Sequence, residues 1–274
     1  MPAFPAGGGA FSPRLCRGLA KPTVQFMLAI IGGSGLTRLS TLAIAHREVV
    51  RTPYGEPSSA LNFGQIAGRD VVFLARHGHG HTIPPHRVNY RANLWALKER
   101  GVDAILAVAS VGSIASGHAP GDLVLPHQLV DYSSGREATF FDGGDRKVVH
   151  IDFTQPYTSL LRTRCLTAAR DAGIKLHDGG VYAAVSGPRL ETAAEIDRFE
   201  RDGATLVGMT GMPETVLARE LGLAYVSIAV VVNHAAGRGD SAEVVALDRI
   251  VAVLETAMGK VRQLIDHVVA QDAA

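Results

Sequence analysis

The sequence has very little cysteine, no long apolar run and almost no surplus of charge. Its 274 residues include only two cysteines, Cys16 and Cys165, which excludes a disulfide framework and is typical of a reducing cytoplasm. No apolar stretch reaches the ~20 residues that a membrane-spanning helix needs. The formal net charge is +1, so no overall field attracts nucleic acid or an anionic membrane. These absences indicate a cytoplasmic protein with neither nucleic acid nor a membrane as its partner.

What is present is the composition of an ordinary globular protein, with 47% hydrophobic and 19% charged residues. Residues 1–26 differ from the rest, because they are rich in Gly, Pro, Ala and Arg and show no periodicity. We interpret them as a flexible N-terminal extension. From residue 27 onward, apolar runs alternate with amphipathic stretches, without a linker or an internal repeat. The pattern predicts one α/β domain over residues 27–274, with a mixed, mostly parallel β-sheet flanked by helices on both faces.

The apolar runs and their flanking turn residues give the expected elements. Strands are expected at Met27–Ile31, Leu61–Ile66, Val71–Leu74, Ala104–Ala109, Gly121–Pro126, Gln128–Asp131, Gly180–Val185 and Ala224–Val232. Helices are expected at Asn89–Lys98, Pro156–Ala172, Thr192–Asp202, Glu214–Leu221 and from Asp240 to the C-terminus.

Two glycine-containing turns are expected where strands end, at 32–36 and 110–113. Glycine lets backbone N–H groups approach an anion, and Ser34 and Ser110 add hydroxyls. The dinucleotide fingerprint fails because Arg38 stands where its third glycine should be, and the Gly-Lys-Ser/Thr of a P-loop is absent. A dinucleotide oxidoreductase is therefore disfavoured. Arg76-His77 ends another strand, and a guanidinium beside an imidazole suits an anion such as phosphate.

Four histidines between His77 and His86 also invite a metal interpretation. No cysteine or carboxylate stands beside them in ligand spacing, so we expect no metal at this segment.

Several short motifs occur in a fixed order along the chain. They are Gly32-Gly33-Ser34-Gly35-Leu36, Arg76-His77-Gly78 with His81-Thr82-Ile83, Val88-Asn89-Tyr90, Gly187-Pro188-Arg189, Met209-Thr210-Gly211-Met212-Pro213-Glu214 and Ser227-Ile228-Ala229. Together they resemble the trimeric purine nucleoside phosphorylase and methylthioadenosine phosphorylase family, in which phosphate cleaves a purine nucleoside into free base and ribose 1-phosphate. The resemblance implies that reaction, a three-layer fold, a homotrimer, and no cofactor besides phosphate as co-substrate.

The resemblance also implies roles for single residues. The expected phosphate-binding residues are Ser34, Arg76, His77, Ala109 through its backbone, Ser110 and Thr210. The expected substrate-binding residues are Met209 under the ribose, Glu191 and Asn233 at the base with His234 and Ala235 beside them, and Leu247, Ile250 and Val251 at the 5′ end. Asn233, Arg76 and His77 are the expected catalytic residues.

Two residues predict which purine is bound. An ionised Glu191 can accept a hydrogen bond from N1–H of a 6-oxopurine but would repel the N1 lone pair of adenine. The amide of Asn233 can donate its hydrogens to N7 and O6 as negative charge develops on the leaving base. Adenine-type members of the family carry aspartates in the stretch that here reads Val232-Asn233-His234-Ala235, and a small hydroxyl residue in place of Glu191. Both differences favour a 6-oxopurine.

The expected sugar pocket is apolar. Members that use ordinary nucleosides offer a polar partner to the 5′-hydroxyl, whereas Leu247, Ile250 and Val251 would favour a methylthio group, at about 0.8 kcal/mol per buried methylene-sized unit. The combination favours S-methyl-5′-thioinosine as substrate. The alternatives are a general 6-oxopurine nucleoside phosphorylase, a methylthioadenosine phosphorylase, and a nucleoside-binding module without catalysis.

Overall fold

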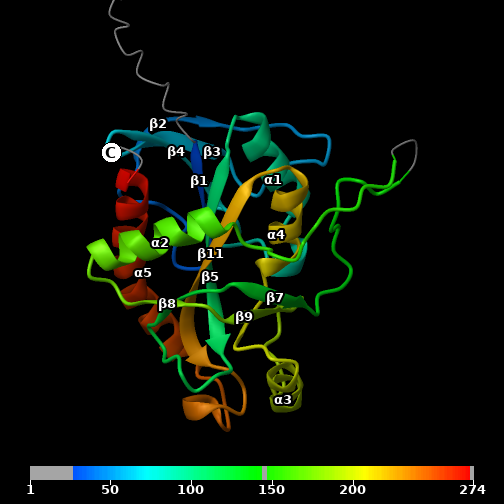
Figure 1. Cartoon of the computed structure of the whole chain (residues 1–274), viewed down its shortest axis with the longest axis vertical. Coiled ribbons are helices and arrows are strands. Elements are labelled where there is room, and N and C mark those ends of the chain that lie inside the picture. Colours follow the sequence, from blue (N-terminus) through cyan, green and yellow to red (C-terminus); the bar gives the residue numbers. More distant parts are fainter. Residues whose placement is uncertain (1–26, 144–146, 272–274) are drawn as a thin grey trace, which may run out of the picture.

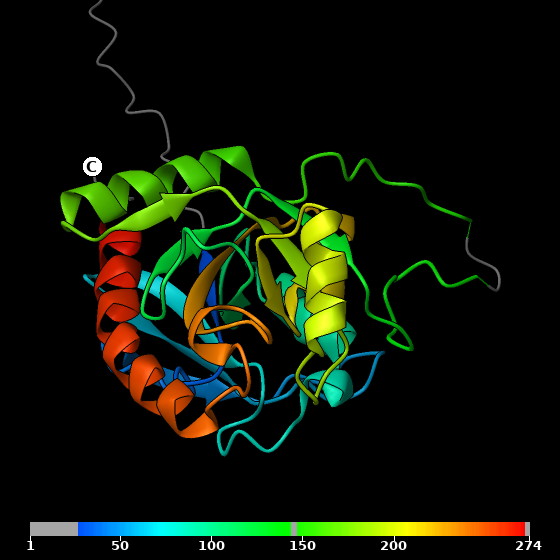
Figure 2. The ribbon, with the colours of Figure 1, turned by 90° about the horizontal axis from the view of Figure 1, so that it is seen from below.

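The computed structural model describes residues 27–143 and 147–271, so the extension predicted over 1–26 lies outside the described residues. In this part of the chain, five α-helices surround an eleven-stranded sheet (Figures 1 and 2). The helices are α1 (Tyr90–Glu99), α2 (Ser159–Asp171), α3 (Ala193–Arg201), α4 (Gly211–Glu220) and α5 (Leu247–Ala270). None of them combines the length and apolar character that crossing a bilayer requires.

The strands form one mixed sheet with a branch. They are β1 (Leu28–Gly32), β2 (Ala43–Glu48), β3 (Leu61–Ile66), β4 (Arg69–Ala75), β5 (Ala104–Ser113), β6 (Leu123–Leu125), β7 (Gln128–Asp131), β8 (Leu176–Asp178), β9 (Val181–Ala184), β10 (Leu206–Gly208) and β11 (Ala224–His234). The order is β2-β3-β4-β1-β5-β10-β9-β7, and β11 joins β5 to β6 and β8. Six of the ten described strand pairings are parallel, which confirms the predicted mostly parallel sheet.

Alternation along the central strands divides the core between the two faces of the sheet. Ile30 of β1 and Leu106 of β5 belong to a buried cluster with α2 and α5. Ile31 and Ile105, their neighbours in sequence, belong to a second cluster with α1 and α4. The strands are therefore buried on both sides, which is why they read as continuous apolar runs, and the predicted three-layer arrangement is confirmed.

Two helices begin where their capping residues predict. The side chain of Asn89 accepts a hydrogen bond from the backbone of Ala92 at 3.0 Å and starts α1. Thr192 and Glu195 form a reciprocal capping box at the start of α3. Both predicted helices are confirmed to within one or two residues.

The predicted turn at 110–113 is wrong, because β5 continues to Ser113. Its last residues pair with β10 and β11, so the backbone finds partners on both sides. Gly112 lies in close packing: a Cβ there would lie 3.3 Å from Val207 and 3.5 Å from the amide of Asn233.

The end of β11 and the start of α5 also differ from expectation. β11 runs to His234, with a β-bulge between Val231 and Asn233 where it pairs with β5. Asn233 thus lies within a strand rather than after it. α5 begins at Leu247 rather than Asp240, because a 3₁₀ turn at Gly239–Ser241 comes first and Ser241 is buried beneath it.

Candidate active site

A cavity of about 640 Å³ opens where β1, β4, β5 and β11 reach their carboxyl ends, with β10 approaching β5 in the opposite direction. Its volume is in the range typical of small-molecule sites. Eleven of the fourteen expected site residues line it, and they come from both halves of the chain. They are Ser34, Arg76, His77, Ala109, Ser110, Glu191, Met209, Thr210, Asn233, Leu247 and Ile250.

The structure places the other three expected residues outside this lining. Strand alternation turns His234 away from Asn233, and its ring packs against Gly239 and accepts from the backbone of Asp240 at 3.4 Å. Ala235 is 1% exposed in an apolar cluster with Ile114. Val251 is 57% exposed on the outer side of α5.

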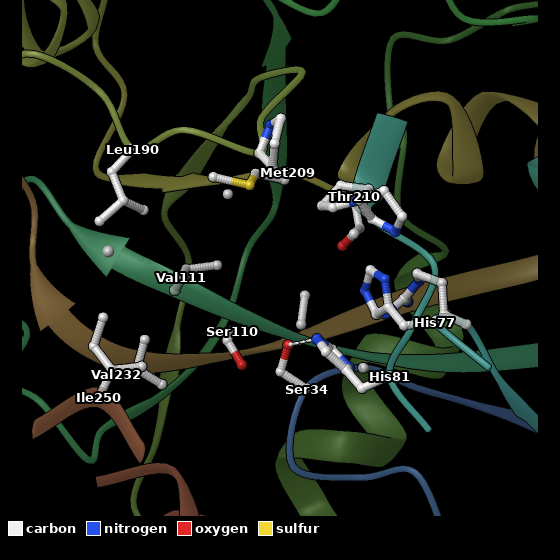
Figure 3. Close-up of a pocket in the computed structure, with 18 of the residues that line it drawn as sticks. Ser34, His77, His81, Ser110, Val111, Leu190, Met209, Thr210, Val232 and Ile250 are labelled. Carbon is white, nitrogen blue, oxygen red and sulfur yellow. Dashed lines mark hydrogen bonds between the residues drawn. The ribbon is translucent and has the colours of Figure 1, made fainter. Parts of the chain in front are cut away.

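Polar groups gather at one end of the cavity (Figure 3). The hydroxyl of Ser34 and Nε2 of His81 lie 3.4 Å apart in a hydrogen bond. The hydroxyl of Ser110 is enclosed yet has no hydrogen-bond partner among the residues that the structure describes. A buried hydroxyl without a partner is unfavourable, so this group has the character of a ligand contact. Leu190, Val232 and Ile250 lie toward the other end, which is apolar (Figure 3).

Arg76 is held by a carboxylate that sequence reasoning did not single out. Its Nε and Nη2 donate to the two carboxylate oxygens of Glu214 at 2.6 and 2.7 Å, and Nη1 donates to the carbonyl of Val108 at 2.9 Å. Arg76 and Glu214 are 1% and 0% exposed. Burial alone would lower the pKa of Arg76, but the charge of Glu214 outweighs it and raises the pKa. The guanidinium is fixed and charged, and Arg76 lines the cavity.

Tyr225 adds a second contact to this pair, since its hydroxyl donates to Glu214 at 2.8 Å. The sequence predicts Arg76 as a phosphate-binding residue, and the structure commits three of its N–H groups to Glu214 and Val108. Glu214 was visible only as an acidic residue in the first turn of a helix, which normally marks a helix start rather than a buried ion pair.

His77 is oriented by the backbone and kept neutral by its surroundings. Its Nδ1–H donates to the carbonyl of Ile83 at 2.8 Å, which leaves Nε2 as the acceptor nitrogen. Burial, and after it the charge of Arg76, lower the pKa of His77 to about 4. A neutral Nε2 can accept the hydrogen of a protonated phosphate oxygen.

The depressed pKa of His77 predicts an acid-sensitive fold. The unfolded chain takes up a proton near pH 6.5, whereas the native state resists it until about 4. Stability is therefore full above pH 6.5 and falls as the pH drops toward 4, by about 3 kcal/mol at 1.36 kcal/mol per unit. Urea unfolding of the wild type and His77→Gln across this range should show a steeper loss in the wild type. Equal slopes would contradict the prediction.

The two base-facing candidates, Glu191 and Asn233, also line the cavity. Glu191 is half-buried, and burial raises its pKa. The amide nitrogen of Asn233 donates to the carbonyl of His234 at 2.5 Å, so one of its hydrogens is already committed. This corrects the expectation that both amide hydrogens are free for the base. Asn233 can offer a ligand one donor.

Met209 lies between the polar and the apolar end of the cavity because Gly187 makes room for it. At φ +64°, Gly187 adopts a left-handed conformation, and a Cβ there would lie 2.4 Å from the sulfur of Met209.

His81 lines the cavity and is, like Glu214, a residue to which the sequence assigned no role. It has φ +52°, unusual for a non-glycine residue, and its ring lies 4.7 Å from that of His77.

Comparison with known proteins gives a consistent set of similarities. The model of the phosphorylase superfamily matches residues 27–270. A probable S-methyl-5′-thioinosine phosphorylase of Pseudomonas syringae pv. tomato is 53% identical over 240 residues, which cover 88% of this chain and 97% of that protein. The 6-oxopurine nucleoside phosphorylase of Pyrococcus furiosus is 46% identical over 77% of this chain and 80% of its own.

Among solved structures, the methylthioadenosine phosphorylase of Schistosoma mansoni in complex with adenine is similar, with a TM-score of 0.86. The two chains are 34% identical, and the match covers 90% of this chain and 91% of that one.

Proposed function

The chain belongs to the phosphorylase superfamily, and from that membership we propose that it cleaves S-methyl-5′-thioinosine with phosphate, giving hypoxanthine and S-methyl-5-thioribose 1-phosphate. It is a pentosyltransferase of the purine nucleoside phosphorylase type. One observation carries the proposal: the anion-binding groups and the base-reading pair line the same cavity.

Phosphate binds at the polar end in this proposal. Arg76 supplies a fixed positive charge, Ser110 an unpartnered hydroxyl, and His77 an acceptor nitrogen for the phosphate O–H. Ser34, Thr210 and the backbone at Ala109 complete the cradle. Preorganised donors of this kind hold the nucleophile without reorganisation at the moment of reaction. The arrangement supports a phosphate oxygen directed at C1′ of the sugar.

Cleavage follows as the phosphate oxygen forms a bond to C1′ and the bond from C1′ to N9 breaks. The bonding electron pair passes to the purine, which takes up the proton that the phosphate gives up and leaves as neutral hypoxanthine. The sugar acquires oxocarbenium character in between. The amide of Asn233 then donates to N7 or O6, where negative charge develops, and Glu191 accepts from N1–H. A donor placed at growing charge lowers the barrier more than it favours the bound substrate.

The sugar lies over Met209, with its 5′ substituent against the apolar residues Leu247 and Ile250. A methylthio group gains from burial there, whereas a hydroxyl would lose its hydrogen bonds to water. A general 6-oxopurine nucleoside phosphorylase is the second candidate, because the relative from Pyrococcus furiosus carries that name.

A phosphate-dependent assay over four nucleosides tests the proposal. Methylthioinosine should be turned over fastest, inosine more slowly, and adenosine and methylthioadenosine least. Equal rates on inosine and methylthioinosine would favour the second candidate. Release of adenine from methylthioadenosine at the highest rate would contradict the base assignment.

Two neighbouring residues of α5 allow a matched test of the sugar pocket. Ile250→Asn places a polar group in the cavity and should reduce the preference for methylthioinosine over inosine, measured as a ratio of kcat/KM, by roughly tenfold, or about 1.4 kcal/mol. Val251→Asn changes an exposed side chain outside the cavity and should leave that ratio unaltered. A larger effect at Val251 would mean that the sugar faces the other side of the helix.

The proposed enzyme is a cytoplasmic homotrimer that needs no metal or organic cofactor for this reaction. The homotrimer follows from the family resemblance, and a mass of three chains by light scattering would support it. Activity that survives dialysis against a chelator, with phosphate restored, would support a cofactor-free reaction.

A further inference from the structure

A second group of chemically active side chains lies at the edge of the sheet, away from the cavity lining. Asp122 immediately precedes β6, and His177 lies in β8, which pairs in parallel with β6 and is the edge strand of this branch. His118 belongs to the loop between β5 and β6. The chain thus brings two imidazoles and a carboxylate together from two segments separated by more than fifty residues.

Their ligand atoms converge on a small volume. One nitrogen of each imidazole and one carboxylate oxygen all lie within 4.8 Å of one another. His177 Nε2 and Asp122 Oδ2 are 3.2 Å apart, close enough for an ion pair but without the alignment of a hydrogen bond. The rings of His118 and His177 meet edge to face, with centroids 4.8 Å apart.

One of these atoms, Nδ1 of His118, is enclosed and has no hydrogen-bond partner among the described residues. Nε2 of His177 is also enclosed, and the carboxylate of Asp122 is the group beside it. Enclosed polar atoms normally have partners, so two imidazole nitrogens gathered at one carboxylate, one of them unpartnered, favour a ligand that accepts lone pairs. A metal cation is such a ligand, because neutral imidazole binds it through the unprotonated nitrogen.

We propose that His118, Asp122 and His177 form a binding site for a borderline divalent transition-metal cation such as Zn²⁺ or Co²⁺. Two imidazoles and one carboxylate match the preference of these ions, whereas Mg²⁺ and Ca²⁺ prefer oxygen ligands alone. All three side chains are half-buried, so solvent can complete the coordination shell. Three protein ligands plus water is a common zinc arrangement.

The charges around the site determine how tightly we expect it to bind a cation. Lys175 is exposed and close enough to affect both His118 and Asp122 through its charge. Its ammonium opposes a cation, so we expect moderate rather than tight binding.

A bound cation would link β8 to the loop that leads into β6. That loop is already tied to β11, because Gly121 donates to the carbonyl of Val231 at 2.8 Å and Val231 donates to the carbonyl of Asp122 at 3.0 Å. The cation would therefore stabilise this edge of the native fold, by an amount that rises with its free concentration.

Equilibrium dialysis of the chelator-treated full chain against Co²⁺, with visible d–d absorption as a second readout, tests the site. We expect one bound Co²⁺ per chain. His118→Ala, His177→Ala and Asp122→Asn should each weaken binding by at least roughly tenfold, since even outer-shell partners of metal sites contribute that much. His118 lies in a loop, so its replacement carries little risk to folding.

Three control variants make the result decisive. Lys175→Met removes the repulsion and should tighten binding by roughly two- to fivefold, whereas a purely structural role of the cluster predicts no change. His46→Ala, an exposed histidine elsewhere, should bind Co²⁺ as the wild type does. Loss of binding in His81→Ala would instead locate the ion beside His77. That outcome, or unaltered binding in His118→Ala, would overturn the proposal.

Discussion

Replacing Glu214 with glutamine is expected to lower the free energy of unfolding by about 3 to 5 kcal/mol, since removing one charge of a buried pair leaves the other uncompensated. Glutamine keeps the shape of the side chain but presents an NH₂ group to one of the two Arg76 donors that now meet carboxylate oxygens. For a chain of this size the loss corresponds to roughly 6 to 20 °C in Tm. Urea and thermal unfolding at a fixed protein concentration measure it.

An exposed pair that also makes two hydrogen bonds is the control. Arg189 donates through both terminal nitrogens to Glu195 at 2.8 and 2.7 Å, but both side chains reach solvent. Glu195→Gln should therefore cost less than about 1 kcal/mol. A similar loss in both variants would mean that burial does not decide the strength of the Arg76–Glu214 pair.

Measuring unfolding with and without added phosphate distinguishes the structural role of Arg76 from its role in binding phosphate. In Glu214→Gln the guanidinium lacks its partner, so a phosphate dianion should stabilise this variant more than it stabilises the wild type. Leu94→Ala is a suitable comparison, because it removes a fully buried side chain of α1 at about 2 to 5 kcal/mol without touching Arg76. Equal stabilisation of both variants by phosphate would remove Arg76 from the phosphate site.

Much of the fold could be predicted because its central strands are buried on both faces. Continuous apolar runs such as the one in β11 have few alternative structures, and the capping residues Asn89 and Thr192 mark helix starts locally. The segment 240–246 shows the limit of this reasoning. Val244 is apolar but 71% exposed, so the hydrophobicity of this segment did not mark a buried helix.

The site residues that lie at strand ends could be predicted from the sequence. The contacts that these residues make with residues far away in the chain could not. Glu214 is 138 residues from Arg76 in the chain, and no local pattern indicates that the two side chains meet. The bulge before Asn233 arises from pairing with Gly112, which only the assembled sheet determines. The hydrogen bond from the amide of Asn233 to the carbonyl of His234 likewise depends on the conformation of this strand end, so the number of free donors could not be read from the sequence.

Asn233→Asp is expected to lower kcat/KM on methylthioinosine by about 10²- to 10³-fold, the usual effect of removing one donor to charge that develops in the transition state. The aspartate can only accept, and so it repels N7 and O6 of a 6-oxopurine. A 6-aminopurine offers N6–H in the place of O6, so its turnover should fall less. The measurement is the ratio of kcat/KM on methylthioadenosine to that on methylthioinosine, which should rise.

The ratio of the two kcat/KM values is the appropriate measurement because the side chain of Asn233 also makes a structural hydrogen bond. Its amide holds the carbonyl of His234 at 2.5 Å, and a carboxylate there would repel that oxygen and disturb the strand end. Such a disturbance slows both substrates and cancels in the ratio. Asn233→Ala removes the donor without adding an acceptor, so it should slow both substrates while the ratio changes little. If the ratio rose equally in Asn233→Ala, or did not rise in Asn233→Asp, Asn233 would not be the residue that reads position 6 of the purine.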